Sequence, residues 1–260
     1  MNTNSLRRLW SQGKAAVQAW DMTGHPEICS LMAEAGYDAV VLDWQHGPGV
    51  TETTVVPCID AINAVPGVAS LVRLPSVNDY YISHVLDAGA SGVIVPMIRS
   101  ADEARIAGAA CRYAPEGHRS MGYAPHMRSG ETLQEYTLRA NREIICLVMI
   151  ETKEALECVE EVCGVPGIDG LYIGPFDLSL NMGIEIATWP EDPRHLAAAD
   201  RIFLAAKQKN LVVGHHGMNP AVSAKFVKLG SQLCQLGGNT SLFEKAAKDA
   251  LLEFRQELEN

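Results

Sequence analysis

Short apolar runs alternate along the chain with longer segments in which apolar residues recur at helical spacing. This alternation predicts β-strands that are each followed by an α-helix. A short amphipathic helix is predicted in residues 1–10, ahead of the first strand. The eight predicted strands cover residues 15–20, 39–43, 68–74, 92–97, 144–151, 168–173, 211–215 and 232–236. The eight predicted helices cover residues 26–35, 51–64, 79–88, 101–113, 153–163, 193–210, 220–229 and 241–257.

Eight strand and helix pairs favour a (β/α)8 barrel that forms a single domain over residues 1–260. A weak repeat supports this fold, because a glycine stands before each even-numbered strand, where it fits a helix end with positive φ. An open doubly wound sheet is the alternative. That fold usually has a Gly-rich phosphate loop after its first strand, and Trp20-Asp-Met-Thr-Gly24 provides none.

The segment from residue 114 to residue 141 contains several prolines and glycines and no clear periodicity. A structureless stretch of this length is usually a functional loop or a lid. In a barrel it would lie on the catalytic side.

The active site of a parallel barrel lies at the C-terminal ends of its strands. Polar residues follow four of the predicted strands at that point, and one arginine ends a fifth strand. Two carboxylates, an arginine and a histidine together indicate a metal site with an anion-binding group and a base. The residues are Asp43, Gln45, His46, Arg73, Glu151, Asp177, His215 and His216.

Glu151 and Asp177 supply hard oxygen ligands, which suit Mg²⁺, Mn²⁺ or Co²⁺ completed by substrate and water. The alternative is that Glu151 caps a helix that begins at Thr152 and Asp177 caps one that begins at Leu178. Spacing alone leaves both interpretations open.

His46 is a candidate base, although Gly47 and Pro48 also make it a plausible turn residue. Arg73 ends a strand that is buried on both sides, so it needs either an anionic ligand or Asp43 as a partner. Four other histidines are expected to be satisfied surface side chains in helices or loops: His84, His118, His126 and His195. No lysine falls inside a predicted strand, which argues against a Schiff-base mechanism.

Composition and net charge limit the kinds of molecule that the protein is expected to bind. The net charge of 21 − 31 = −10 and a pI near 5.3 argue against nucleic acid or an anionic membrane as the partner. The seven cysteines form no CxxC pair, and the first residues lack the pattern of a secretory signal. A cytoplasmic protein with small-molecule substrates is expected.

Several segments together resemble one known family, the HpcH/HpaI aldolases, which are metal-dependent class II pyruvate aldolases on a (β/α)8 barrel. The similarity extends along nearly the whole chain. It rests on Ala35-Gly-Tyr-Asp-Ala-Val-Val-Leu-Asp43 with His46, Val72-Arg-Leu-Pro75, Val95-Pro-Met97 with Ala101-Asp-Glu-Ala-Arg105, Arg112-Tyr-Ala-Pro-Glu-Gly117, Ile150-Glu-Thr-Lys-Glu-Ala155 and Ile173-Gly-Pro-Phe-Asp-Leu-Ser179.

The resemblance implies reversible cleavage of 4-hydroxy-2-oxoacids to pyruvate, or a pyruvate analogue, and an aldehyde. Glu151 and Asp177 would bind the divalent metal, which chelates a carboxylate oxygen and the 2-oxo oxygen and stabilises an enolate. Arg73 would steady the enolate oxygen. His46 would be the general base working through water, with Asp43 beside it in the catalytic set.

The resemblance also implies an oligomer, commonly a homohexamer built as a trimer of dimers that exchange the last helix. Asp87 matches an acidic residue that reaches the base of a neighbouring subunit.

Departures from the family pattern bear on the substrate. Met149, Phe176 and Gln45 replace other common residues, and His215 and His216 stand where apolar residues are more usual. The predicted substrate contacts are Arg73, Met149, Gly174, Pro175, Phe176, Asp177 and His215. Two alternative functions are an acyl-CoA carbon–carbon lyase of the citrate or malyl-CoA lyase type and a non-catalytic barrel scaffold.

Overall fold

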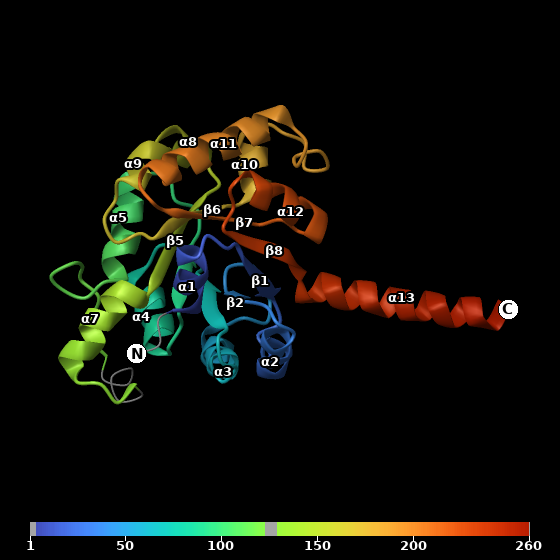
Figure 1. The fold of residues 1–260 in the computed structure, drawn as a ribbon, viewed down its shortest axis with the longest axis horizontal. Coiled ribbons are helices and arrows are strands. Elements are labelled where there is room, and N and C mark those ends of the chain that lie inside the picture. The colour runs from blue at the N-terminus through green and yellow to red at the C-terminus, as the bar shows by residue number, and fades with distance from the viewer. Residues whose placement is uncertain (1–3, 123–128, 260) are drawn as a thin grey trace.

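A computed structural model describes residues 4–122 and 129–259 of the chain. Eight parallel strands close into a barrel in sequence order, and β1 pairs with β8 (Figure 1). The predicted barrel is therefore confirmed. The strands are β1 (Ala16–Asp21), β2 (Ala39–Asp43), β3 (Ala69–Arg73), β4 (Gly92–Val95), β5 (Ile145–Ile150), β6 (Gly170–Ile173), β7 (Val212–His215) and β8 (Leu233–Gly238).

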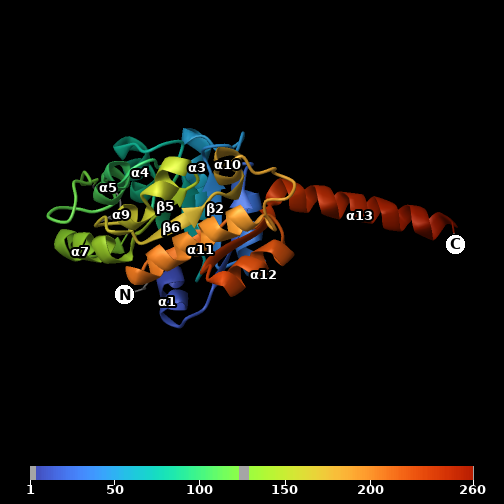
Figure 2. The same cartoon turned by 90° about the horizontal axis from the view of Figure 1, so that it is seen from above.

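Helices surround the barrel, and α1 precedes its first strand (Figures 1 and 2). The glycines predicted to have positive φ before the even-numbered strands do so, with φ between 87° at Gly167 and 132° at Gly230. The described helices are α1 (Ser5–Ser11), α2 (Pro26–Glu34), α3 (Glu52–Asn63), α4 (Asp79–Asp87), α5 (Ala101–Ala110), α7 (Leu133–Glu143), α8 (Lys153–Glu157), α9 (Val159–Cys163), α10 (Pro175–Asn181), α11 (Pro193–Gln208), α12 (Pro220–Leu229) and α13 (Asn239–Glu259).

The strands are mostly apolar because both of their faces are buried. In β5, every residue is buried. Leu147 and Met149 belong to the cluster inside the barrel, whereas Cys146 and Val148 belong to the cluster between the barrel and the helices. Successive side chains of a strand point to opposite faces, so inward and outward positions alternate. This alternation decides which residue after each strand enters the barrel mouth.

The prediction of a structureless segment over residues 114–141 is wrong for its last part. Helix α7 begins there with a capping box, in which Thr132 Oγ1 accepts from the Glu135 N–H at 3.3 Å and the Glu135 carboxylate accepts from the Thr132 N–H at 2.9 Å. Thr132-Leu-Gln-Glu135 is the sequence signature of such a start. Residues 123–128, with His126, lie outside the described residues, so the lid stays a prediction there.

Two other helix predictions need correction. The single helix predicted over residues 153–163 is two short helices, α8 and α9, joined at Cys158. Helix α10 directly follows β6 and is not among the eight predicted helices, because its seven residues are too few to show a helical period. The capping alternative for Asp177 placed a helix start three residues later, at Leu178.

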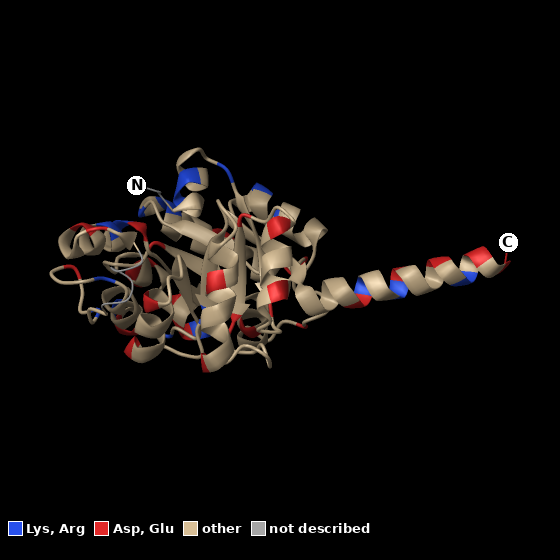
Figure 3. Ribbon diagram, turned by 90° about the horizontal axis from the view of Figure 1, so that it is seen from below, with Lys and Arg blue, Asp and Glu red and all other residues tan. Residues whose placement is uncertain are grey.

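Helix α13 extends away from the barrel (Figures 1 and 2). Charges of both signs lie along it (Figure 3), and several large apolar side chains are exposed on it. An exposed apolar stripe on a long helix needs a partner surface. Exchange of this helix between subunits remains a prediction that these features support. The exposed apolar residues are Leu242, Phe243, Leu251, Leu252, Phe254 and Leu258.

No helix in the described ranges has the length and apolarity needed to span a bilayer.

His195 is not the surface histidine that was expected. Its side chain is fully buried with that of His215 in an aromatic cluster between the barrel and the surrounding helices. The ring centroids of His195 and Trp189 lie 4.8 Å apart, and the His215 ring stacks on Phe226 with 3.6 Å between centroids. Burial lowers the pKa of His195 to about 4 and that of His215 well below its ordinary value. Both imidazoles are therefore neutral in the folded protein at neutral pH.

These imidazoles predict acid sensitivity. The unfolded chain binds protons at them below about pH 6.5, whereas the folded chain resists protonation, so stability is complete above that pH and falls as the pH drops towards about 4. We expect the urea midpoint to be lower at pH 5 than at pH 7. The fall should be smaller in His195→Gln but unchanged in His118→Gln, which alters an exposed histidine. An equal fall in all three proteins would contradict this account.

Candidate active site

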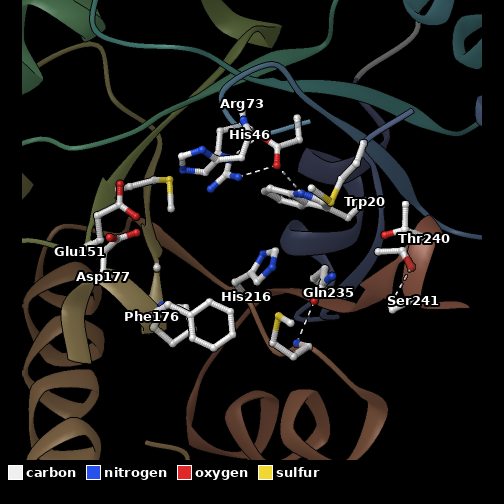
Figure 4. Close-up of a pocket in the computed structure, with 17 residues that line it drawn as sticks. Trp20, His46, Arg73, Glu151, Phe176, Asp177, His216, Gln235, Thr240 and Ser241 are labelled. Carbon is white, nitrogen blue, oxygen red and sulfur yellow. Dashed lines mark hydrogen bonds and ion pairs between the residues drawn. The ribbon is translucent and has the colours of Figure 1, made fainter. Parts of the chain in front are cut away.

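A cavity of about 300 Å³ opens at the C-terminal ends of the strands (Figure 4). The predicted site residues lie around it, with three exceptions, Gln45, Asp87 and His215. Those that line it are Asp43, His46, Arg73, Met149, Glu151, Gly174, Pro175, Phe176, Asp177 and His216.

Asp43 and Arg73 form a rigid clamp at one side of the cavity. Arg73 Nε donates to Asp43 Oδ1 at 2.9 Å, and Nη2 donates to Oδ2 at 2.5 Å. Asp43 also accepts from the Trp20 indole N–H at 3.1 Å and from the His46 backbone N–H at 3.0 Å. Register explains the pairing, since Asp43 and Arg73 are partners at the ends of adjacent strands β2 and β3. Of the two partners that the sequence left open for Arg73, the structure shows Asp43.

The clamp fixes the charge state of Asp43. Burial alone would raise the pKa of this carboxyl group, but the hydrogen bonds and positive charge of Arg73 outweigh burial and lower it below its ordinary value. The Arg73 guanidinium lies 5.0 Å above the Trp20 ring centroid and still lines the cavity with part of its edge. Asp43 therefore holds Arg73 in position and acts on the site through it.

Glu151 projects into the mouth just after β5, and its side chain does not cap a helix. Thr152 performs that role, because its hydroxyl accepts from the Ala155 N–H at 3.1 Å. The Glu151 carboxylate instead accepts from the Met97 N–H at 2.7 Å. Met97 has φ 56°, an uncommon value for a residue with a side chain, and this local strain accompanies a backbone donor that is directed at a buried charge.

The carboxylates of Glu151 and Asp177 lie side by side at the cavity wall (Figure 4). Asp177 comes from the first turn of α10, so it does not precede a helix at Leu178 as its capping alternative required. Burial, together with the negative charge of Asp177, raises the pKa of Glu151 to about 7, although the Met97 N–H and Arg73 oppose the rise. The two carboxylates therefore place more negative charge at this wall than nearby positive groups balance.

A divalent cation would balance this excess negative charge. Two carboxylates supply hard oxygen ligands, and a cation between them would remove the charge repulsion that raises the pKa of Glu151. Among residues 4–122 and 129–259, no cluster of three or more His, Cys, Asp or Glu side chains could enclose a metal. Further ligands would have to come from substrate and water, as in an open catalytic site.

Gly174 allows Glu151 to approach the β6–α10 turn. A Cβ at Gly174 would lie 2.2 Å from Glu151 Oε2 and 2.9 Å from Met149 Cε. A side chain at this position would therefore push the carboxylate out of place. The next residues of the turn bring Phe176 to the cavity, where its ring packs edge-on against Trp189 at 6.3 Å between centroids.

His46 stands in the turn after β2, with an exposed imidazole on the cavity wall (Figure 4). Asp87 does not reach it within one chain. The Asp87 carboxylate accepts from Arg119 at 2.7 Å and lines a separate cavity beside α7. A contact between Asp87 and the base of a neighbouring subunit remains a prediction.

His215, which was predicted to contact substrate, does not line the cavity. His215 shares the outward face of β7 with Val213 and packs behind the barrel, so the next residue, His216, enters the cavity instead. Strand alternation places the two neighbouring histidines on opposite faces, and the contacts of β7 decide which face is inward. Reasoning from carboxylates and bases also missed Trp20 and Gln235, which reach the cavity from β1 and β8.

The site can orient an oxygen-rich small molecule, neutralise charge on it and move a proton beside it. These properties are typical of a barrel enzyme rather than of a scaffold. Comparison with known proteins identifies the class of enzyme.

Residues 18–246 match the model of the HpcH/HpaI aldolase/citrate lyase family. The chain is 32% identical over 253 residues to the 4-hydroxy-2-oxo-heptane-1,7-dioate aldolase of Escherichia coli, covering 96% of this chain and 95% of that protein. It is 33% identical over 256 residues to the aldolase of the same name from Salmonella dublin, covering 98% and 95%. The solved HpcH/HpaI aldolase of Desulfitobacterium hafniense DCB-2 superposes with a TM-score of 0.88 at 26% identity over 96% of each chain.

The chain belongs to the HpcH/HpaI aldolase/citrate lyase family. It is a carbon–carbon lyase of the aldolase type, and neither the acyl-CoA lyase nor the scaffold alternative is favoured.

The Asp43 clamp predicts a specific loss of stability. Asp43→Asn leaves the Arg73 charge without its partner in the barrel mouth, which should lower the free energy of unfolding by about 3 kcal/mol. Asp102→Asn is a matched control, because it removes one partner of an exposed pair with Arg105 and should lower it by less than about 1 kcal/mol. Urea denaturation measures both, and equal losses would contradict the clamp.

Proposed function

We propose that this chain is a divalent-metal-dependent aldolase that reversibly cleaves 4-hydroxy-2-oxoacids to pyruvate, or a pyruvate analogue, and an aldehyde. The observation that carries this proposal is the buried Glu151 carboxylate beside Asp177, with Arg73 and His46 on the same cavity. The curated relatives, named as aldolases of a 4-hydroxy-2-oxoacid, support it.

Glu151 and Asp177 would hold the metal ion, for which Mg²⁺, Mn²⁺ and Co²⁺ are the candidates. When bound, a divalent cation supplies Lewis-acid polarisation of the 2-oxo group. Met149 and Phe176 would bound the pyruvyl methyl group. The turn at Gly174 and Pro175 would place the Phe176 N–H towards the substrate carboxylate.

Cleavage then needs one proton transfer and one bond rearrangement. His46, acting through water, would take the proton of the 4-hydroxyl group as the C3–C4 bond breaks and C4 becomes the aldehyde carbon. The electron pair of that bond moves towards the 2-oxo oxygen, where Arg73 would stabilise the developing negative charge. The proton returns to C3 to give pyruvate. A positioned base of this kind contributes roughly 10²- to 10⁴-fold.

The proposed assembly is a homohexamer, a trimer of dimers that exchange α13. The exposed apolar residues of that helix support it. So does Asp87, which could assist His46 only from another subunit. A cytoplasmic setting is supported by seven free cysteines, six of them buried.

The function is tested by coupled detection of pyruvate from a panel of 4-hydroxy-2-oxoacids, with chelator and with added Mg²⁺, Mn²⁺ or Co²⁺. Metal-dependent release from at least one compound is expected. If no compound releases pyruvate and a CoA ester is turned over, the chain is an acyl-CoA lyase instead. The cavity offers little support for that outcome, since Arg73 is the one Lys or Arg among its described lining residues.

Two substitutions should weaken metal binding by different routes. Glu151→Gln removes a charged ligand, and Gly174→Ala displaces that ligand with a Cβ. Titration with Mn²⁺ should show affinity lowered by at least about tenfold in both, with the fold retained. Gly164→Ala is the matched control at a helix end where φ is −81°. Affinity equal to wild type in Glu151→Gln would remove it from the metal site.

Deuterium exchange at C3 of pyruvate separates binding from proton transfer. His46→Ala should keep pyruvate affinity but slow exchange by at least about 10²-fold, because only the base is lost. Asp87→Asn should have a smaller effect of the same kind. Arg73→Lys should weaken both binding and exchange, since an ammonium cannot reproduce the planar fork held by Asp43. Exchange at the wild-type rate in His46→Ala would make His46 only a turn residue.

A further inference from the structure

The cavity has two chemically different walls. Glu151 and Asp177 lie on one side, whereas Gln235, Thr240 and Ser241 lie on the other, with the His216 ring between them (Figure 4). The polar wall comes from β8 and the start of α13. The mechanism proposed above for the pyruvyl half does not use His216 or the polar wall of Gln235, Thr240 and Ser241.

The Tyr172 hydroxyl lies between Gln18 and His216 inside the barrel. The Gln18 amide donates to the Tyr172 hydroxyl oxygen, and that hydroxyl lies 3.4 Å from His216 Nδ1. With Gln18 as the donor, the tyrosine proton is free to donate to Nδ1. An imidazole that accepts at Nδ1 carries its proton at Nε2. Tyr172 and Gln18 are both fully buried, so water does not compete for this arrangement.

The His216 ring is held in place and stays neutral. It packs edge-on against Trp20 with 4.5 Å between ring centroids, and Trp20 is itself anchored by Asp43. Burial and the nearby positive charge of Arg73 lower the pKa of His216 to about 3, although Asp43 opposes this. Among the described residues, Nε2 has no hydrogen-bond partner, so its N–H is available to a ligand in the cavity.

Gln235 provides a second neutral donor. Its side chain is 1% exposed, and its Oε1 accepts from the Met218 N–H at 2.8 Å. That bond fixes the amide and leaves the NH₂ group without a partner in the part of the chain that the structure describes. Because Gln235 lines the cavity, this NH₂ group can donate to a ligand there.

Charge and polarity together restrict the ligand. The described lining contains one cation, Arg73, and Asp43 already neutralises it, while Glu151 and Asp177 add negative charge. A second carboxylate on the substrate would meet no free counter-charge. An alkyl chain would leave the His216 and Gln235 donors unsatisfied. A hydroxyl oxygen satisfies a neutral donor without needing a counter-charge.

We propose that His216, with Gln235, forms a specificity site for hydroxyl groups on the aldehyde half of the substrate, so that the enzyme acts on hydroxylated aldehydes. His216 donates from Nε2, and Tyr172 positions it. This inference rests on the proposed aldolase function and names its acceptor class.

The test compares matched aldehydes in the synthetic direction with pyruvate and saturating metal. For each protein, kcat/KM for glycolaldehyde is divided by kcat/KM for acetaldehyde, which lacks only the hydroxyl group. The ratio is internal to each variant, so differences in folding or metal loading cancel. The proteins are wild type, His216→Leu, His216→Gln, Tyr172→Phe and, as a control outside the cavity, His118→Gln.

The ratio should fall by at least about tenfold in His216→Leu, because an apolar side chain cannot pair with the hydroxyl group. His216→Gln, which keeps a neutral donor, should recover part of the ratio. Tyr172→Phe should lower it less than His216→Leu, since the tautomer is no longer fixed but the ring remains. His118→Gln should match wild type.

An unchanged ratio in His216→Leu would overturn the inference, as would a wild-type kcat/KM higher for succinic semialdehyde than for glycolaldehyde. Neither result affects the aldolase proposal, because addition to some aldehyde still occurs in both. Wild-type enzyme that neither exchanges the C3 protons of pyruvate nor adds it to any aldehyde would overturn the aldolase proposal itself.

Discussion

A carboxylate buried at the mouth of the barrel is the constraint on which this site depends. Glu151 is 2% exposed, accepts one hydrogen bond from Met97 within the described residues and lies beside a second carboxylate. Such a charge is unfavourable in the free protein, which is why its pKa rises to about 7. The strained backbone at Met97 and the missing side chain at Gly174 keep the carboxylate there despite that cost. This arrangement supports the proposal that Glu151 and Asp177 hold a cation.

The same mouth contains a carboxylate with the opposite behaviour. Asp43 is equally buried, but Arg73 binds both of its oxygens and lowers its pKa. One acid is therefore a permanent anion that fixes an arginine, while the other can accept a proton or a cation. Two carboxylates thus acquire two roles from their partners alone, which is a recurrent way to divide acid–base work within one site.

The neutral wall adds a third kind of environment. Burial and the nearby positive charge of Arg73 lower the pKa of His216 to about 3, and the Tyr172 hydroxyl lies 3.4 Å from its Nδ1. The charged groups of the cavity are Glu151, Asp177 and the Asp43–Arg73 pair, whereas the side of Gln235 offers hydrogen bonds without charge. In the proposed complex, this difference in polarity would orient the substrate.

The sequence by itself determined the barrel, because eight apolar runs buried on both faces have few other parallel arrangements. It also determined the candidate set of His46, Arg73, Glu151 and Asp177, since residues after parallel strands meet at one edge. Short elements such as α10 escaped prediction because a few residues show no period. Tertiary structure alone decided that Arg73 pairs with Asp43 and that His216, not His215, faces the cavity. Those outcomes depend on register and on inward or outward orientation, which are set by contacts between strands far apart in the chain.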